Sequence, residues 1–275
     1  MNEIASALSG SFIGEQGGNL VGTNALNLYF LGLTVLFVIT LSSHSLIRYL
    51  QQKYTQDSSD LPLYFAVAIM VTCIAGFAII AAALAEIEAL PQFDHALADS
   101  VGMSTPPAAL QFFALVTHAG DTFTYTVICT VMAGAMLLSK RYLLALGTVM
   151  AIGGNSILNP SLKAIFERVR PVHEHGLVVA NGWSFPSGHT SGAVVTYGII
   201  AYILLRSTPR QWHPAILVSV VSLAFTIACS RVFLQVHYLS DVIAGALSGL
   251  CWLTLTILTI HLLEQRHNAL VTPAT

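Results

Sequence analysis

The stretch LPLYFAVAIMVTCIAGFAIIAAAL, at residues 61–84, contains no charged residue. A helix that crosses the hydrocarbon core of a bilayer needs about 20 mostly apolar residues, so this stretch is long enough to span a membrane. The whole chain has the same character, because 55% of its 275 residues are hydrophobic and only 9% are charged. In soluble domains, roughly a quarter of all residues are charged. The sequence therefore predicts an integral membrane protein.

Seven apolar stretches of this kind predict an all-α fold, a multi-pass transmembrane helical bundle. We expect the spans at residues 26–50, 61–84, 122–138, 142–158, 189–205, 214–233 and 239–263. Thr105 and two prolines precede residues 108–116, where they predict either a short helix in the membrane interface or an ordinary loop. We find no internal repeat and no linker long enough to divide the chain.

Charge and cysteine content exclude several classes of protein. A formal net charge of −2 leaves no basic surplus for binding nucleic acid. The four cysteines lie inside apolar runs, without the spacing of a metal site or a disulfide framework: Cys73, Cys129, Cys229 and Cys251. Residues 1–25 contain no Lys or Arg, and the first long apolar stretch starts late, so we expect no cleaved signal peptide.

The positive charges predict the orientation, because short loops rich in Lys and Arg stay in the cytoplasm. Seven of the 11 fall on one side of this threading, which places the N-terminus outside and the C-terminus inside: Arg48, Lys53, Lys140, Arg141, Arg206, Arg210 and Arg266. The other four gather in two short outer segments: Lys163, Arg168, Arg170 and Arg231. Such a concentration indicates either an anion site or interfacial side chains that reach for water.

The first outer segment reads KAIFERVRP, from Lys163 to Pro171. Lys163 and Arg170 are seven positions apart, so on one helix both would project from the same face. A lysine supplies a point charge, and an arginine supplies a planar fork that matches phosphate oxygens. Alone the pattern is weak, because many transmembrane helices end in basic residues.

The second segment, PSGHTSG, opens the fifth apolar stretch at residues 186–192. A helix that starts here would leave backbone N–H groups and the positive end of its dipole free to bind an anion. Gly188 would let the backbone approach a ligand closely, and His189 in the first turn could donate a proton to a departing oxygen. A plain helix cap with an interfacial histidine is the alternative.

In the third segment, Ser230 and Arg231 are followed by five residues and then His237, and Asp241 comes four positions after that histidine. On a helix the Asp241 carboxylate would lie one turn from the imidazole and accept its N–H. That contact would leave the other ring nitrogen free to attack. The alternative is that His237 and Asp241 are merely solvated at the interface. Taken together, the three segments predict one outer site for phosphoryl transfer through a phosphohistidine.

The motifs Lys-x6-Arg-Pro, Pro-Ser-Gly-His and Ser-Arg-x5-His-x3-Asp, in this order, resemble the signature of the type 2 phosphatidic acid phosphatase family. This family is related in its site to vanadium-dependent haloperoxidases, and the match spans residues 163–241. The resemblance implies that His237 is the nucleophile, His189 the acid and Asp241 the residue that orients His237. It implies no metal or other cofactor, and a phosphate held by five groups: Lys163, Arg170, Arg231, Ser187 and the amide of Gly188.

Membrane members of that family have a six-helix core, which would begin here at residues 61–84. The resemblance therefore implies an N-terminal segment, 1–60, with one extra span, and a membrane phosphatase domain, 61–275. We expect the site on the extracytoplasmic, periplasmic side of the cell (inner) membrane. The sequence indicates nothing about the oligomeric state.

The expected substrate is a phosphate monoester or diphosphate of a membrane lipid. The resemblance favours undecaprenyl diphosphate, followed by phosphatidylglycerophosphate and phosphatidate. Two alternatives stay open, a phosphotransferase that passes the phosphate to another lipid and a non-enzymatic transporter that binds lipid phosphate.

Other residues receive less weight. His173 and His175 form a His-x-His pair without further ligands, a weak candidate for a metal site. We expect Arg168 to be an exposed charge rather than an aid to phosphate binding. Trp183 and Phe185 are typical of a membrane interface or could brace a lipid's entry. Gly245 and Gly249, in contrast, have the spacing of close helix packing.

Overall fold

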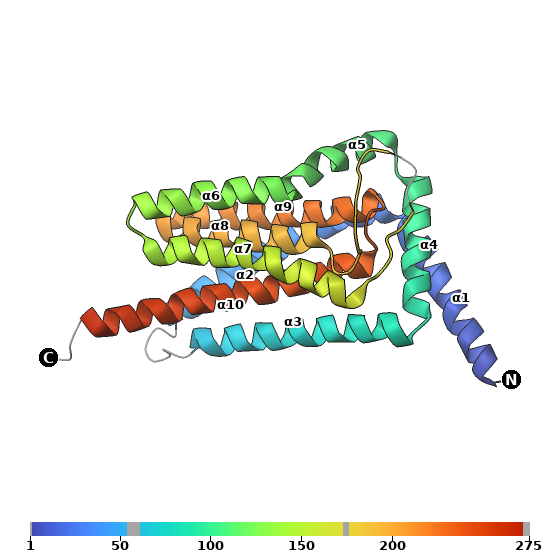
Figure 1. Cartoon of the computed structure of the whole chain (residues 1–275), viewed down its shortest axis with the longest axis horizontal. Coiled ribbons are helices and arrows are strands. Elements are labelled where there is room, and N and C mark those ends of the chain that lie inside the picture. Colours follow the sequence, from blue (N-terminus) through green and yellow to red (C-terminus); the bar gives the residue numbers. More distant parts are fainter. Residues whose placement is uncertain (1, 54–60, 173–175, 272–275) are drawn as a thin grey trace.

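The computed structural model describes residues 2–53, 61–172 and 176–271, and these contain helices but no strand. The helices are α1 (Asn2–Thr23), α2 (Ala25–Lys53), α3 (Leu61–Glu86), α4 (Ala89–Ser104), α5 (Pro107–Val116), η1 (Thr117–Gly120), α6 (Thr122–Leu138), α7 (Tyr142–Phe166), α8 (Gly188–Ser207), η2 (Arg210–Trp212), α9 (His213–Phe233) and α10 (Leu239–Val271). The predicted all-α bundle is confirmed (Figure 1).

Six of these helices are long and apolar enough to cross a membrane within the described ranges, which confirms a multi-pass architecture. The count rises to seven if α5 with η1 and α6, which are bent by 43° at a short break, form one span. Only 6% of the apolar window of α2 and of α3 is buried, against 56% in α8. The first two spans therefore lie at the periphery of the bundle, and α8 lies near its centre.

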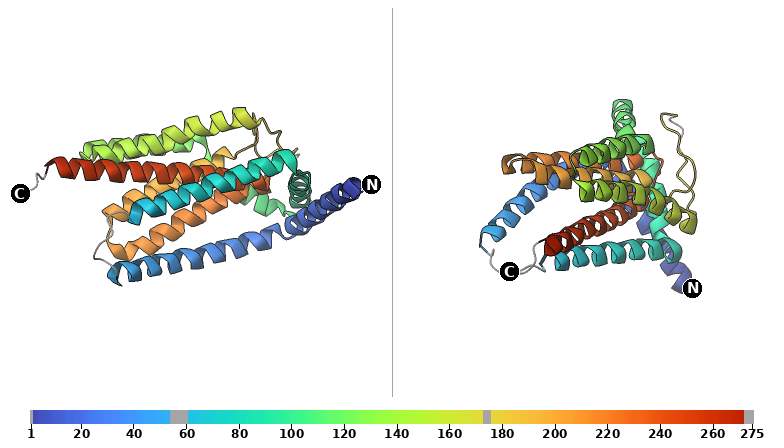
Figure 2. Two further views of the ribbon diagram at one scale, coloured as in Figure 1. Left: turned by 90° about the horizontal axis from the view of Figure 1, so that it is seen from below. Right: turned by 60° about the vertical axis from the view of Figure 1, so that its left-hand side comes forward.

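The core forms where α8 packs against α7, α9 and α10. Figures 1 and 2 show these helices running along the long axis of the molecule, with α4 lying across one end of them. Small residues let α8 and α10 approach closely. A Cβ at Gly245 would lie 2.6 Å from the carbonyl oxygen of Ser187, and one at Gly249 would lie 2.7 Å from that of Ser191. The expected packing role of both glycines is confirmed.

Two helices were not expected from the sequence, α1 and α4, which pack against each other. Neither contains a long apolar run, so the criterion for membrane spans passed over them. A Cβ at Gly22 of α1 would lie 2.6 Å from the side chain of Ser100, and Ser100 donates a hydrogen bond of 2.6 Å to Asn19 Oδ1. The signal in the sequence was the repeat of glycine at positions 14, 18 and 22.

Smaller expectations had mixed outcomes. Residues 107–116 form a helix, α5, rather than a loop. All four cysteines are free, as expected. Phe185 is only 1% exposed and its ring packs against Phe77 and Phe166, so the interpretation as an interfacial aromatic was wrong for this residue. Trp183 is 40% exposed.

Candidate active site

Four helix termini meet at the end of the bundle that α4 crosses (Figures 1 and 2). They are the C-terminal ends of α7 and α9 and the N-terminal ends of α8 and α10. Lys163 lies in the last turn of α7, Arg231 in the last turn of α9, and Asp241 in the first turn of α10. All three motifs therefore lie at one end of the molecule.

The imidazole of His237 has different partners at its two nitrogens. Nδ1 lies 3.4 Å from Asp241 Oδ2 and 3.2 Å from Ser184 Oγ, while Nε2 lies 3.0 Å from Arg170 Nη1. Ser184 donates its hydroxyl proton to Asp241 Oδ2, so an Nδ1–H can donate to either oxygen. That tautomer leaves the lone pair of Nε2 on the side of the arginine.

The predicted helical turn between His237 and Asp241 was wrong in one respect. α10 begins at Leu239, so His237 precedes the helix and only Asp241 lies in it. The backbone N–H of Tyr238 donates to Asp241 Oδ2 at 3.0 Å, and this bond helps to hold the carboxylate beside the His237 ring. His237 is 2% exposed, and burial lowers its pKa to about 3, so the ring is uncharged near neutral pH.

Lys163 and Arg170 do not share a helical face as expected. α7 ends at Phe166, and Glu167 adopts a left-handed conformation with φ of 45°, so Arg170 comes from the following loop. The two cations nevertheless converge. Lys163 Nζ donates to the carbonyl oxygen of Trp183 at 2.5 Å, and Arg170 Nη2 donates to the same oxygen at 3.1 Å.

Arg168 is the clearest departure from the sequence interpretation, because it is not an exposed charge. Its side chain is 15% exposed and forms ion pairs with two fully buried carboxylates. Nη1 lies 2.6 Å from Asp241 Oδ1, and Nη2 lies 2.8 Å from Asp94 Oδ2 on α4. The guanidinium also lies over the ring of Tyr238, at 4.2 Å from its centroid. Arg168 thus connects α4 to the carboxylate beside His237.

Asp94 was missed by the sequence, which offered no motif around it. Its oxygens also accept the backbone N–H and the hydroxyl of Ser240, the residue before Asp241. Burial raises the pKa of the Asp94 carboxyl, and the bonds from Ser240 and Arg168 oppose that rise.

His189 lies in the first turn of α8, as expected, directly after the N-cap and Gly188. The cap is Ser187, whose Oγ accepts the N–H of Thr190 at 3.4 Å. His189 Nε2 lies 3.0 Å from Asp121 Oδ1, a contact that the sequence did not reveal. Asp121 precedes α6, so a second histidine and carboxylate pair forms between segments far apart in the sequence.

Arg231 is 4% exposed, and its Nη1 donates to Thr117 Oγ1 at 2.6 Å. Its Nε is buried, and no described residue accepts its proton. Because buried donors nearly always have an acceptor, this unpaired N–H is a candidate donor to a ligand.

One electrostatic environment includes all three motifs. The charges of Arg170 and Arg231 act on both His189 and His237, and Lys163 interacts with the same two arginines and with Asp241. Asp241 is already paired with Arg168. Asp121 is the second carboxylate here, and it acts on Arg231 and pairs with His189. Three neighbouring cations therefore face two carboxylates, one of them already neutralised by Arg168, a distribution that favours a bound anion.

No group of three or more His, Cys, Asp or Glu side chains within the described ranges could hold a metal ion. The pair His173 and His175 lies outside the described residues.

Comparison with known proteins agrees with this arrangement. Residues 141–264 match the model of the PAP2 superfamily, the group whose motifs the sequence resembles. Phosphatidylglycerophosphatase B of Bacillus subtilis is 29% identical over 176 residues, which cover 63% of this chain and 86% of that protein.

Two crystal structures are similar as well. The first, a transmembrane PAP2-type phosphatidylglycerolphosphate phosphatase from Bacillus subtilis, is 30% identical with a TM-score of 0.64, covering 69% of this chain and 94% of the other. The second, LpxE of Aquifex aeolicus, is 23% identical with a TM-score of 0.46, covering 58% and 92%. The chain therefore belongs to the PAP2 superfamily, as a multi-pass membrane lipid phosphatase.

Proposed function

We propose that the protein hydrolyses a phosphate monoester or diphosphate of a membrane lipid through a phosphohistidine on His237. The observation that carries this proposal is the asymmetry of the His237 ring. Nδ1 faces Asp241 and Ser184, and Nε2 faces the guanidinium of Arg170 at 3.0 Å. A nitrogen that faces a cation is placed to attack a phosphorus atom whose oxygens that cation binds.

In the first step, Nε2 of His237 forms a bond to phosphorus while the bond from phosphorus to the leaving oxygen breaks. His189 gives a proton to that oxygen, and the Asp241 carboxylate stabilises the positive charge on the His237 ring. In the second step, His189 takes a proton from water, whose oxygen forms a bond to phosphorus while the bond between phosphorus and Nε2 of His237 breaks, and inorganic phosphate is released. His237 then returns to its neutral form.

Five groups would hold the phosphoryl oxygens: the side chains of Lys163, Arg170, Arg231 and Ser187, and the amide of Gly188. Gly188 fits the last role because the start of α8 exposes free N–H groups. A Cβ at this position would lie 2.8 Å from Asn159 Oδ1, so glycine also lets the turn pack against α7.

The substrate is a lipid phosphate, because the site lies at one end of apolar helices. Undecaprenyl diphosphate is our first candidate. Phosphatidylglycerophosphate is the second, and it is favoured by the names of the two relatives from Bacillus subtilis. Phosphate release by the purified protein from both lipids, from phosphatidate and from lipid A would rank them.

We place the site on the extracytoplasmic side of the cell membrane, with the N-terminus outside and the C-terminus in the cytoplasm. Support comes from the opposite end of the bundle, where Lys140, Arg141, Arg206 and Arg266 gather. Green fluorescent protein fused to the C-terminus should fluoresce, since it folds in the cytoplasm. A dark, fully translocated fusion would reverse this topology.

The decisive experiment replaces each histidine. We expect His237→Ala and His189→Ala to abolish phosphate release from lipid substrates in detergent, while His267→Ala, an exposed histidine at the other end, keeps wild-type activity. Acid-labile radiolabelled phosphate should be trapped on the wild-type protein and never on His237→Ala. Full activity of His237→Ala would end the proposed mechanism.

We also propose that the reaction needs no metal. Chelators should leave the rate unchanged, and vanadate should inhibit as a mimic of five-coordinate phosphorus. A rate lost to EDTA and restored by a divalent ion would contradict this view. Labelled lipid product on addition of an acceptor lipid would indicate phosphotransfer instead.

A further inference from the structure

A large cavity opens at the end of the bundle opposite to the candidate active site. Its volume is about 1050 Å³, and it lies between α2, the end of α8 and the beginning of α9. Ligand pockets commonly have volumes of about 300–1,000 Å³, so the cavity has room for a molecule with a bulky tail. None of the three active-site motifs contributes to it.

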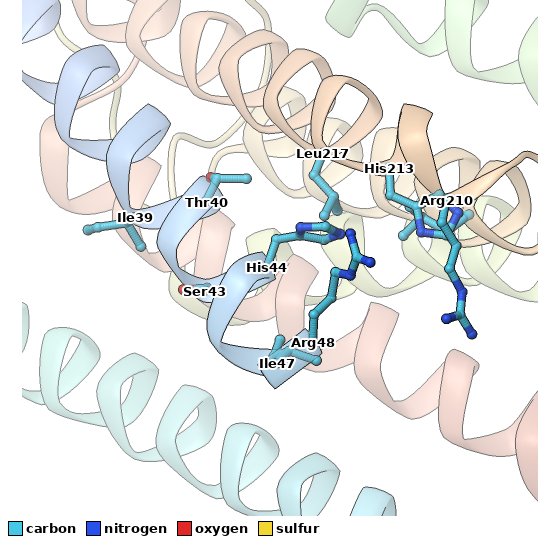
Figure 3. Close-up of a pocket in the computed structure, with 10 residues that line it drawn as sticks. Ile39, Thr40, Ser43, His44, Ile47, Arg48, Arg210, His213 and Leu217 are labelled. Carbon is cyan, nitrogen blue, oxygen red and sulfur yellow. The ribbon is translucent and has the colours of Figure 1, made fainter. Parts of the chain in front are cut away.

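Four basic side chains line this cavity. Figure 3 shows His44 and Arg48 extending from α2 toward the side where His213 and Arg210 lie, at the start of α9 and in η2. The two imidazole rings are 6.4 Å apart. None of the described residues that line the cavity is acidic.

The side chains of Arg48 and Arg210 differ from that of Arg206 in having no hydrogen-bond or ion-pair partner among the described residues. Arg206, in the last turn of α8, forms an ion pair of 2.9 Å with Glu264. The side chains of Arg48 and Arg210 form no hydrogen bond or ion pair with any residue that the structure describes. Two unpaired guanidinium groups beside one cavity favour an anion between them, and a phosphate matches their planar forks.

Of the other six lining residues, Thr40 and Ser43 are polar and four are aliphatic, and the aliphatic side chains decide between a free anion and a lipid. Ile39, Ile47 and Leu217 line the same cavity, and Ile47 is 54% exposed on a helix that is apolar enough to span the membrane. A free phosphate ion gains nothing from such walls. A lipid would place its phosphate between the arginines and its acyl chains along the aliphatic side chains.

The attachment of α2 shows what such a lipid would do. Near the other end, Tyr29 of α2 stacks on Phe225 of α9 and its hydroxyl bonds Thr226 at 3.1 Å. Between the described residues of α2 and α9 that line the cavity there is no side-chain hydrogen bond or ion pair, and only the rings of His44 and His213 are in contact. A molecule in the cavity would therefore connect α2 to α9 at the end where the two helices have few side-chain contacts of their own.

We propose that this cavity binds one anionic phospholipid from the leaflet opposite to the candidate active site, and that the lipid fastens α2 to α9. The site is separate from the phosphatase chemistry, and its ligand carries a phosphodiester rather than a cleavable monoester.

The test uses phosphatidylglycerol and the full-length protein in a mild nonionic detergent. Native mass spectrometry should show one retained phosphatidylglycerol, and the lipid should raise the melting temperature. The double variant Arg48→Gln/Arg210→Gln should bind it about 30-fold more weakly, given roughly 1 kcal/mol for each of the two basic residues near a lipid surface. Its phosphatase activity is measured in parallel. Because lipid binding and phosphate release are separate readouts, this proposal and the proposed function can fail independently.

The matched control is Lys140→Gln/Arg266→Gln, which removes two charges from the same end but from a different cavity. It should bind phosphatidylglycerol like the wild type. Equal retention in all three proteins would overturn the proposal, as would equal loss in both double variants. Phosphatidylcholine bound as tightly, or inorganic phosphate alone giving the same thermal shift, would also overturn it.

A second measurement needs no variant. Phosphatidylglycerol with a photoreactive headgroup should label wild-type peptides that contain residues 39–48 and 210–217. Labelling confined to other peptides would refute the assigned position.

Discussion

The buried carboxylate of Asp94 offers the sharpest test of how the fold supports the candidate site. Asp94 Oδ2 lies 2.8 Å from Arg168 Nη2, and Arg168 Nη1 lies 2.6 Å from Asp241 Oδ1. Asp94→Asn removes a charge and keeps the shape of the side chain. Arg168 is then left with one carboxylate partner instead of two, and its guanidinium loses its fixed point on α4.

The magnitude follows from burial. Asp94 is 0% exposed and the Arg168 side chain is 15% exposed, so solvent screens their ion pair little. Breaking a buried pair completely costs about 3–5 kcal/mol, and one charge-assisted hydrogen bond contributes about 1.5–3 kcal/mol. Because the amide oxygen of Asn can still accept from Ser240, we expect a loss of about 2–3 kcal/mol in the free energy of unfolding.

Activity should fall for a separate reason. We propose that Asp241 orients His237, and a shift of about 1 Å in a positioned group can cost roughly 100-fold in rate. We expect kcat to fall by about 10- to 100-fold, with KM within about threefold, since Asp94 contacts no phosphate-binding group. The measurement is lipid phosphate release well below the melting temperature, on protein shown to be folded by circular dichroism.

Asp99→Asn is the matched control, because Asp99 is an exposed carboxylate on the same helix. It should leave kcat and the melting temperature unchanged. If Asp94 acts through Arg168, the double variant Asp94→Asn/Arg168→Gln should have the kcat of Arg168→Gln alone. A kcat of Asp94→Asn equal to that of Asp99→Asn, or additive losses in the double variant, would refute the positioning role.

Three further expectations concern the acid, the nucleophile and the packing of the core. His189→Ala should lose far more activity toward an alkyl lipid phosphate than toward an activated aryl phosphate, whose leaving group needs no proton; equal losses would remove His189 from the acid role. The free energy of unfolding should fall as pH drops below about 6.5 because of His237. The imidazole is protonated there in the unfolded chain but stays neutral in the folded protein, where its pKa is about 3. The melting temperature of His237→Gln should therefore fall less steeply with acid than that of the wild type, and parallel curves would contradict this sign. Gly249→Ala should destabilise the protein by about 1–3 kcal/mol, since the new Cβ would lie 2.7 Å from the Ser191 carbonyl oxygen, whereas Gly134→Ala, with open space, should be neutral in a thermal melt.

The membrane spans could be predicted because one physical requirement, a long apolar run, fixes them. α6 begins and ends at the expected residues, and α3 differs by two residues at its end. α7 extends eight residues beyond the expected end at residue 158. The apolar pattern stops there, but Asn159 finds a partner in the carbonyl oxygen of Pro186, and Lys163 finds one in that of Trp183. Of these two bonds, only that of Asn159 is buried. Both partners come from the loop before α8 and are invisible in a local pattern.

The motif residues could be proposed as site residues because each motif combines residue types suited to phosphate chemistry in that spacing, and the structure brings the three motifs to one end of the bundle. Asp94, Asp121 and Ser184 could not, since each is a single polar residue in an ordinary local sequence. Their importance follows from tertiary contacts with Arg168, His189 and His237. Arg168 was misjudged for the same reason, because a charge next to a motif is exposed unless a distant carboxylate is folded against it.

The helices that the sequence missed are linked to this site by a continuous set of contacts. α1 packs its glycine face on α4, where Ser100 bonds Asn19 at 2.6 Å. α4 in turn holds Arg168 through Asp94, and its Ala98 carbonyl oxygen accepts a bond of 2.8 Å from Gln235, two residues before His237. A helix too polar to span the bilayer can lie across the helix ends because its buried charge is neutralised there. The N-terminal helices therefore support the turn that carries His237, although they contribute no group to the phosphate.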